Sequence, residues 1–127
     1  MSRIVLDAGA LIALERNDRT LWAALKLAAL RSTDVFVPST ALAQVWRGTA
    51  RQAHLARALR HCVVSPFDSV AWEVGELCGK TATSDICDAH VAIVGARQGD
   101  VLYTSDPEDL DRLLAALGEG EPVVVRC

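Results

Sequence analysis

Four aspartates are placed where their side chains could act together on a ligand. Asp7 directly follows a short apolar run, and Asp106 follows another after two small polar residues. Asp85 and Asp88 stand three positions apart near the start of a predicted helix, which places both carboxylates on one helical face. Ligands of parallel sheets bind beyond the carboxyl ends of the strands. We therefore expect the four carboxylates to meet there.

These carboxylates predict a hard divalent cation. Without one they would repel each other, and some would need raised pKa values. Mg²⁺ or Mn²⁺ relieves the repulsion and prefers oxygen ligands. Such an ion lowers the pKa of an attacking water and neutralises charge on a phosphate, which is a common device for cleaving phosphodiesters. Asp7, Asp85, Asp88 and Asp106 are the expected metal ligands. A simpler interpretation stays open, since each carboxylate also suits a helix N-terminus.

Short apolar strands alternate with helices along the whole chain. Because parallel strands buried on both faces are wholly apolar, this order predicts a three-layer α/β/α domain with a mostly parallel sheet of four or five strands, in one domain over 1–127. Strands are expected at Ile4–Leu6, Val35–Val37, Cys62–Val64, Val101–Tyr103 and Val123–Val125, the last as an edge strand. Helices are expected at Ala8–Arg16, Arg19–Leu30, Ser39 or Thr40 to Trp46, Arg51–Arg60, Ser69–Cys78, Ser84 or Asp85 to Arg97, and Glu108–Leu117.

Composition favours a packed, cytosolic protein. Hydrophobic residues make up 51% of the 127 residues, and the net charge of -3 argues against a plain basic nucleic-acid binder. Residues 1–63 nevertheless hold nine Lys or Arg against four Asp or Glu, whereas residues 64–127 hold four against twelve. The four cysteines form no Cys-x-x-Cys pair, so we expect reduced thiols. The first apolar run is too short for a signal peptide or a membrane span, which predicts a cytoplasmic location.

Four segments together resemble PIN-domain proteins, and more closely VapC-type toxins of toxin–antitoxin pairs. The first begins with Ile4–Asp7, the second is the helix of Pro38–Val45, the third is Asp88-Ala89-His90-Val91-Ala92, and the fourth is Thr104-Ser105-Asp106. The resemblance covers nearly the whole chain and implies an Mg²⁺- or Mn²⁺-dependent endoribonuclease that cuts structured RNA (tRNA or rRNA). It also implies a homodimer and inhibition by a cognate antitoxin.

The resemblance assigns catalytic roles and shows two departures. Asp7, Asp88 and Asp106 take the catalytic positions of the family, Asp85 is an additional acid, and Thr104 belongs to the last motif. Gln44 stands where the family usually has Glu. Its amide oxygen can still coordinate a cation, but it carries no charge and cannot act as a base at neutral pH. Gly9 replaces a Ser or Thr that is often found two positions after the first aspartate, which removes one polar contact.

Basic and aromatic residues beside the Gln44 helix suggest a path for RNA. Arg47 and Arg51 lie about one turn apart and are the expected phosphate contacts, with a solvated helix face as the alternative. Trp46 suits either stacking on a base or a place in the core, and Trp22 and Trp72 are expected in core or dimer contacts. The histidine at position 90 points away from the Asp88 face of its helix, so it is left out of the site.

Two other functions compete with a nuclease. In the first, Gln44 marks a site that is catalytically weak or inactive, and the domain only binds RNA or an antitoxin. In the second, the protein is a flavodoxin-like receiver that is phosphorylated on an aspartate. That function fits poorly, because a receiver needs a late lysine and Lys80 is the last lysine in the chain.

Overall fold

Five parallel strands form one sheet in the order β3–β2–β1–β4–β5. The computed structural model describes residues 2–127. The strands are β1 (Ile4–Leu6), β2 (Val35–Pro38), β3 (Val63–Ser65), β4 (Val101–Thr104) and β5 (Val123–Arg126). The predicted sheet is thus confirmed, with β5 at an edge. β1 and β4 are neighbours in the centre, and Leu6 is paired with Tyr103. The residues that follow these two strands therefore start from adjacent points.

The strand order excludes the receiver fold. Flavodoxin-like sheets have the order 2-1-3-4-5, in which the third strand lies beside the first. Here β3 pairs with β2 at the outer edge, and β4 takes the place beside β1. The receiver alternative is therefore wrong, because its phosphoacceptor would need a central third strand.

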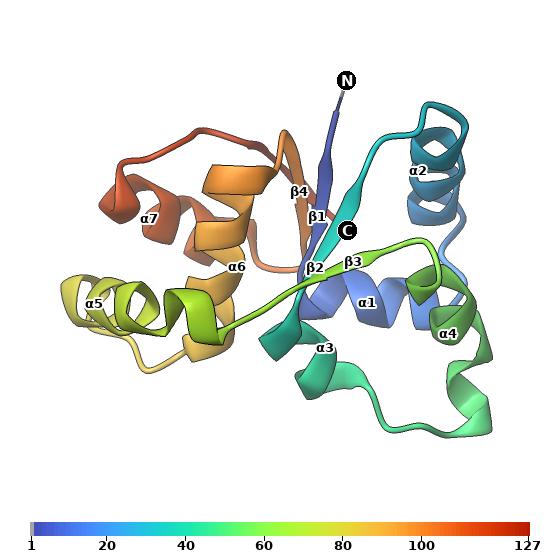
Figure 1. Cartoon of the computed structure of the whole chain (residues 1–127), viewed down its shortest axis with the longest axis horizontal. Coiled ribbons are helices and arrows are strands. Elements are labelled where there is room, and N and C mark those ends of the chain that lie inside the picture. Colours follow the sequence, from blue (N-terminus) through green and yellow to red (C-terminus); the bar gives the residue numbers. More distant parts are fainter. Residues whose placement is uncertain (1) are drawn as a thin grey trace.

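Helices cover both faces of the sheet (Figure 1). On one side α1 packs against β1 and β4, with α2 and α4 beyond it, and on the other side α6 packs against β1 and β2, next to α5 and α7. α3 contacts both α1 and α6, so it joins the two layers. The predicted three-layer arrangement is confirmed. The helices are α1 (Ala8–Glu15), α2 (Arg19–Leu30), α3 (Ser39–Val45), α4 (Ala53–Leu59), α5 (Ala71–Thr81), α6 (Ile86–Gln98) and α7 (Pro107–Leu117).

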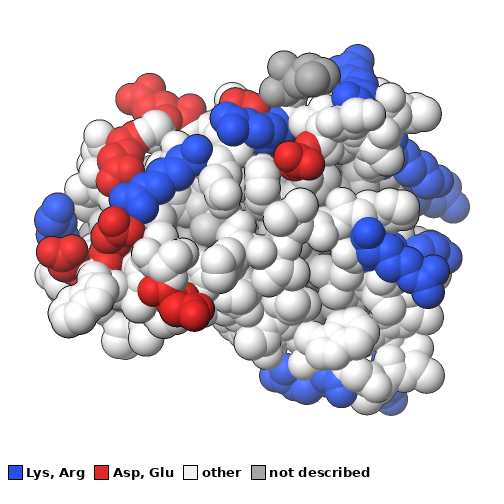
Figure 2. Space-filling model, in the orientation of Figure 1, with Lys and Arg blue, Asp and Glu red and all other residues white. Residues whose placement is uncertain are grey.

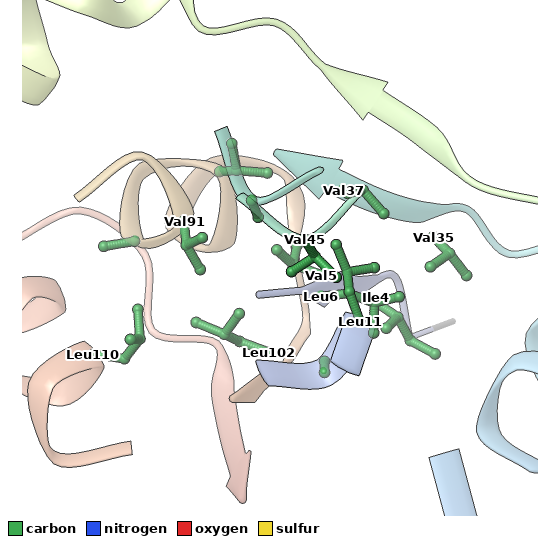
Figure 3. Close-up of a cluster of buried hydrophobic side chains, with 14 of the residues drawn as sticks. Ile4, Val5, Leu6, Leu11, Val35, Val37, Val45, Val91, Leu102 and Leu110 are labelled. Carbon is green, nitrogen blue, oxygen red and sulfur yellow. The ribbon is translucent and has the colours of Figure 1, made fainter. Parts of the chain in front are cut away.

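Aliphatic side chains from both layers meet at the central strand (Figure 3). All three residues of β1 are buried, which is the pattern of a strand covered on both faces. Leu11 of α1, Val91 of α6 and Leu110 of α7 are also fully buried in this cluster. Because truncating such a leucine to alanine costs about 2–5 kcal/mol, the core fixes the strand ends on which the aspartates stand.

Three aspartates cap the helices that they precede. Asp7 Oδ1 accepts the Ala10 N–H at 2.8 Å, and Asp18 Oδ2 accepts the Leu21 N–H at 2.9 Å. Asp85 caps α6 through a bond of 3.0 Å from the Asp88 N–H. The helix-capping interpretation is therefore confirmed for Asp7 and Asp85. Asp106 occupies the N-cap position of α7 without a side-chain bond to the helix.

The start of α3 differs from the prediction. Pro38 precedes the helix, and neither Ser39 nor Thr40 caps it, because the chain enters the helix directly from β2. Thr40 instead bonds His90 across the layers, with 2.8 Å between Oγ1 and Nδ1. His90 is fully buried and packs edge-on against Phe67, so its exclusion from the acidic site agrees with its position in the core.

Two other helices have shifted bounds. A 3-10 turn at Ala50–Gln52 precedes α4, and another at Asp68–Val70 precedes α5. α5 runs past Cys78 to Thr81, since the residue that ends it is Ala82, in the left-handed conformation with φ 53°. Trp72 is 88% exposed, so the core is excluded as its place, and the alternative of a dimer contact stays a prediction. All four cysteines are free, and none of the helices within 2–127 is long and apolar enough to span a membrane.

Candidate functional site

Asp7 is the buried centre of the acidic site. Its main chain continues from β1 and donates to the Tyr103 carbonyl at 3.2 Å, which joins it to the end of β4. Only 4% of the residue is exposed. Burial raises the pKa of this carboxyl, while hydrogen bonds from Thr104, Ala10, Ser105 and Gly9 oppose the rise. A bound cation would stabilise the ionised form of this buried carboxyl, because it would replace the water that burial removes.

Asp88 lies in the first turn of α6, where it is affected by the charge of Asp7. Burial raises the pKa of Asp88 to about 7, and the neighbouring charge of Asp85 adds to the rise, as do Asp7 and Asp109. Asp85 is exposed at the helix N-terminus, where the helix dipole favours negative charge. The charges of Asp7 and Asp85 therefore both act on Asp88, although 81 positions separate Asp7 from Asp88, and a shared metal site of the three stays a prediction.

Asp106 contacts a residue that sequence reasoning missed, and no interaction joins its carboxyl directly to Asp7, Asp85 or Asp88 within residues 2–127. Its carboxyl is hydrogen-bonded to that of Asp109, which is the main reason why the pKa of Asp106 is raised. Asp109 also acts on Asp88 and forms an ion pair of 3.5 Å with Arg112. Asp109 thus connects Asp106 to the other acids. Asp106 and Asp109 repeat the three-residue spacing of Asp85 and Asp88, but this spacing does not indicate that α7 packs beside α6.

The Thr104 hydroxyl connects the two strand ends. Thr104 is fully buried, its Oγ1 accepts the Asp106 N–H at 2.9 Å, and its hydroxyl bonds Asp7. One hydroxyl can serve both groups because it carries one donor and two acceptor lone pairs. Thr104 therefore holds the Asp7 carboxyl and the Asp106 main chain in one arrangement.

The donor set suits a small hard cation. Over residues 2–127, no three acidic, histidine or cysteine side chains are close enough to form a complete metal-binding cluster. Mg²⁺ does not need one, because it usually takes one or two carboxylates and completes its shell with water and substrate phosphate. Asp7 and Asp88 offer two carboxylates, and burial disfavours the ionised form of each. The residues present therefore fit Mg²⁺ or Mn²⁺, and the metal site stays a prediction.

Ser105 fills the space beside Gly9. A Cβ at position 9 would overlap Ser105 Oγ and Cβ and would lie 3.1 Å from the Ser105 backbone nitrogen. The space that a side chain at position 9 would need is thus occupied by Ser105, which follows β4. The Ser105 backbone N–H, rather than its hydroxyl, is hydrogen-bonded to the Asp7 carboxyl.

Gln44 and the two predicted RNA contacts lie further along α3 and its C-terminal loop. All three side chains are exposed, and no hydrogen bond found within 2–127 joins Gln44 to an aspartate. Arg47 folds back to the carbonyls of Ala43 and Trp46, at 3.2 and 2.8 Å. The roles of Gln44, Arg47 and Arg51 in the site stay predictions.

Comparison with solved structures gives a likeness of fold. The fold is the three-layer α/β/α arrangement with a parallel sheet, consistent with the PIN-like fold that the sequence predicted. No family model and no curated protein matches the sequence. Among solved structures, the chain matches one from the crystal structure of VapBC2 from Rickettsia felis bound to a DNA fragment from their promoter. The TM-score is 0.69 at 14% identity, over 98% of both chains, which is a likeness of fold.

Asp88 should make the metal-free protein less stable as the pH rises. Between the ordinary pKa of 3.8 and a folded-state pKa of about 7, the folded protein keeps a proton that the unfolded chain has released. Stability must therefore fall with rising pH across this window. In chelator, the melting temperature of wild type should fall from pH 4 to 7, and Asp88→Asn should flatten that fall. Asp111→Asn is the control, and parallel profiles for wild type and Asp88→Asn would refute the assignment.

Gln44→Glu tests whether α3 faces the same cation. If it does, the added charge should lower the Mg²⁺ and Mn²⁺ concentrations needed for half-maximal cleavage, because the cation is attracted more strongly. Gln44→Ala should change the midpoints only modestly, since it removes a neutral ligand. Titrations of cleavage against both metals measure this. Equal midpoints for wild type and Gln44→Glu would place Gln44 outside the site.

Proposed function

We propose that the protein is an Mg²⁺- or Mn²⁺-dependent endoribonuclease, the toxin of a type II toxin–antitoxin pair, that hydrolyses phosphodiester bonds in structured RNA such as tRNA or rRNA. The convergence of Asp7 and Asp88 at the carboxyl end of the central strand is the main support. The likeness of fold to a chain of the VapBC2 structure adds to it. Neither a binding module nor a structural domain needs two poorly solvated carboxylates at this position.

The chain's own residues prepare the site for a cation and a phosphate. Asp7 and Asp88 would hold the metal, which supplies charge neutralisation at the phosphate and activation of the attacking water when it is bound. Asp85, Asp106 and Asp109 surround this pair and strengthen the attraction for a cation. Thr104 keeps the Asp7 carboxyl in one orientation, so little reorganisation is needed when the phosphate arrives.

The proposed partners follow from the same assignment. The VapBC2 structure contains a toxin–antitoxin complex on promoter DNA. By analogy, this chain would be held inactive by a cognate antitoxin and would act as a homodimer in the cytoplasm. A metal-free, inactive module that binds RNA or antitoxin is the competing function, and the uncharged Gln44 on α3 is the observation that favours it.

Cleavage of total cellular RNA tests the proposal directly. Purified protein is incubated with the RNA in Mg²⁺, in Mn²⁺ and in chelator, and the cut ends are mapped. We expect discrete cuts that need the metal and that disappear in Asp7→Asn. RNA that stays intact in both metals, although the protein binds it, would support the inactive module instead.

A further inference from the structure

A basic hollow lies between α2 and α4, on the far side of α1 from the acidic site. Asn17, Arg19, Trp22, Ala23, Lys26 and Arg57 line it, and its volume is about 490 Å³. The α2 residues are spaced as one helical face, and Arg57 reaches across from α4. Figure 2 shows Lys and Arg along the side of the molecule where α2 and α4 lie, and Asp and Glu mainly over the side of α5 and α7.

The cations of this hollow have no carboxylate partner. The arginines that do form ion pairs within 2–127 are Arg3, Arg97, Arg112 and Arg126. No carboxylate lines the hollow, and Arg19, Lys26 and Arg57 form none of the ion pairs found within residues 2–127. Positive charges gathered without an anion repel one another, and a bound anion removes that cost.

The hollow also presents a fixed aromatic plane. Trp22 Nε1 donates to the Leu14 carbonyl at 3.4 Å, which ties the indole to the end of α1. The Arg57 guanidinium lies 5.0 Å from the indole centre and is bonded to His54 at 3.3 Å. A solvated helix face needs neither contact. Indole rings and guanidinium groups are planar, and both stack on nucleic-acid bases. The N–H groups of a guanidinium also bind phosphate through paired hydrogen bonds.

A second hollow lies between the basic hollow and the acidic site, and it shares no lining residue with the basic hollow. It runs along the flank of α1, has a volume of about 450 Å³, and is lined at one end by Gly9 and Ser105, beside Asp7. Its other end includes Arg16 and Asp18, next to the first residues of the basic hollow. The eight residues of α1 span about 12 Å. A single RNA strand crosses such a distance within a few nucleotides.

We propose that the basic hollow is a second binding site for the RNA strand, which holds a phosphate and a base a few nucleotides from the scissile bond. The proposal rests on the proposed function, because it assumes that RNA is the substrate. An acidic peptide would be attracted by the same charges, but it has no use for the Trp22–Arg57 plane. The site would place the strand along α1 and so select which phosphate reaches Asp7 and Asp88.

RNA binding without cleavage tests the site. Labelled single-stranded RNA of about 12 nucleotides is titrated in chelator with an Asp7→Asn protein, and binding is followed by fluorescence anisotropy. Arg19→Ala with Arg57→Ala should weaken binding at least about fivefold and lower the salt slope by about one unit for each lost phosphate contact. Arg31→Ala is the matched control, because this exposed arginine directly follows α2 and lies outside the hollow, and it should change neither quantity.

The outcomes separate this site from the nuclease itself. Cleavage is then measured with added metal in proteins that retain Asp7. The double variant should have a higher KM for the long RNA than wild type, with nearly the same kcat. With an RNA of about 4 nucleotides, which is too short to reach the hollow, the two proteins should have the same KM. Unchanged affinity and salt slope would overturn the site even if the protein cleaves RNA. If the double variant binds RNA more weakly but the wild-type protein cleaves no RNA, only the proposed nuclease activity is overturned. Weaker binding of a polyglutamate peptide with unchanged RNA binding would assign the hollow to a protein partner and overturn the proposal.

Discussion

Replacing Asp7 or Asp88 with Asn should lower RNA cleavage at least about tenfold, because each change removes a charge that holds the cation at the transition state. A tenfold loss corresponds to about 1.4 kcal/mol. Asp106→Asn should cost less, since the Asp106 carboxyl is exposed and bonds Asp109 rather than Asp7 or Asp88. Rates of cleavage of a mapped RNA at saturating metal measure the three effects.

The folded state should survive these changes. Asp88→Asn relieves repulsion from Asp85, Asp7 and Asp109, so the metal-free protein should be at least as stable as wild type at neutral pH. Asp7→Asn keeps an oxygen that can accept the Ala10 N–H. Asp111→Asn, an exposed change on α7, is the control for activity. Full activity in both Asp7→Asn and Asp88→Asn would remove the proposed site.

The sheet and the capped helices were predictable because their signals are local. A wholly apolar run such as Ile4–Leu6 indicates a doubly covered strand, and an aspartate before a helical pattern indicates a cap. Both patterns depend on residues within a few positions of each other. The strand order was a different matter, since the sequence patterns also allowed the receiver fold that the pairing of β3 with β2 excludes.

The parts of the site that could not be predicted depend on contacts between distant segments. Thr40 suits an N-cap by type, yet its hydroxyl bonds His90, which lies 50 positions away. Asp109 enters the acidic group only because α7 packs beside α6. The basic hollow needs Arg57 of α4 beside Trp22 of α2, a contact that no spacing within either helix indicates. Side-chain partners are therefore less predictable than the elements that carry them.

Gly9→Ala should lower the free energy of unfolding by about 1–3 kcal/mol, which is the usual cost of overfilling a packed site. The new Cβ would meet Ser105 Oγ, Cβ and backbone nitrogen, so more than a rotamer change is needed to make room. Gly75→Ala is the matched control, because Gly75 is also helical and a Cβ there meets nothing within 4 Å. That change should stabilise the protein by about 0.5–1 kcal/mol, since alanine favours helix over glycine. Urea unfolding measures both.

Ser105→Gly provides the rescue. Removing the Ser105 side chain clears the atoms that a Cβ at position 9 would overlap, whereas the backbone nitrogen at 3.1 Å remains. The double variant should therefore recover part of the loss caused by Gly9→Ala, which is a coupling that independent sites would not show. Cleavage should follow the same order, because Ser105 and Gly9 both donate backbone hydrogen bonds to the Asp7 carboxyl. Equal stabilisation by Gly9→Ala and Gly75→Ala would contradict the close packing of α1 against the end of β4, and with it the assignment of Ser105 to the site.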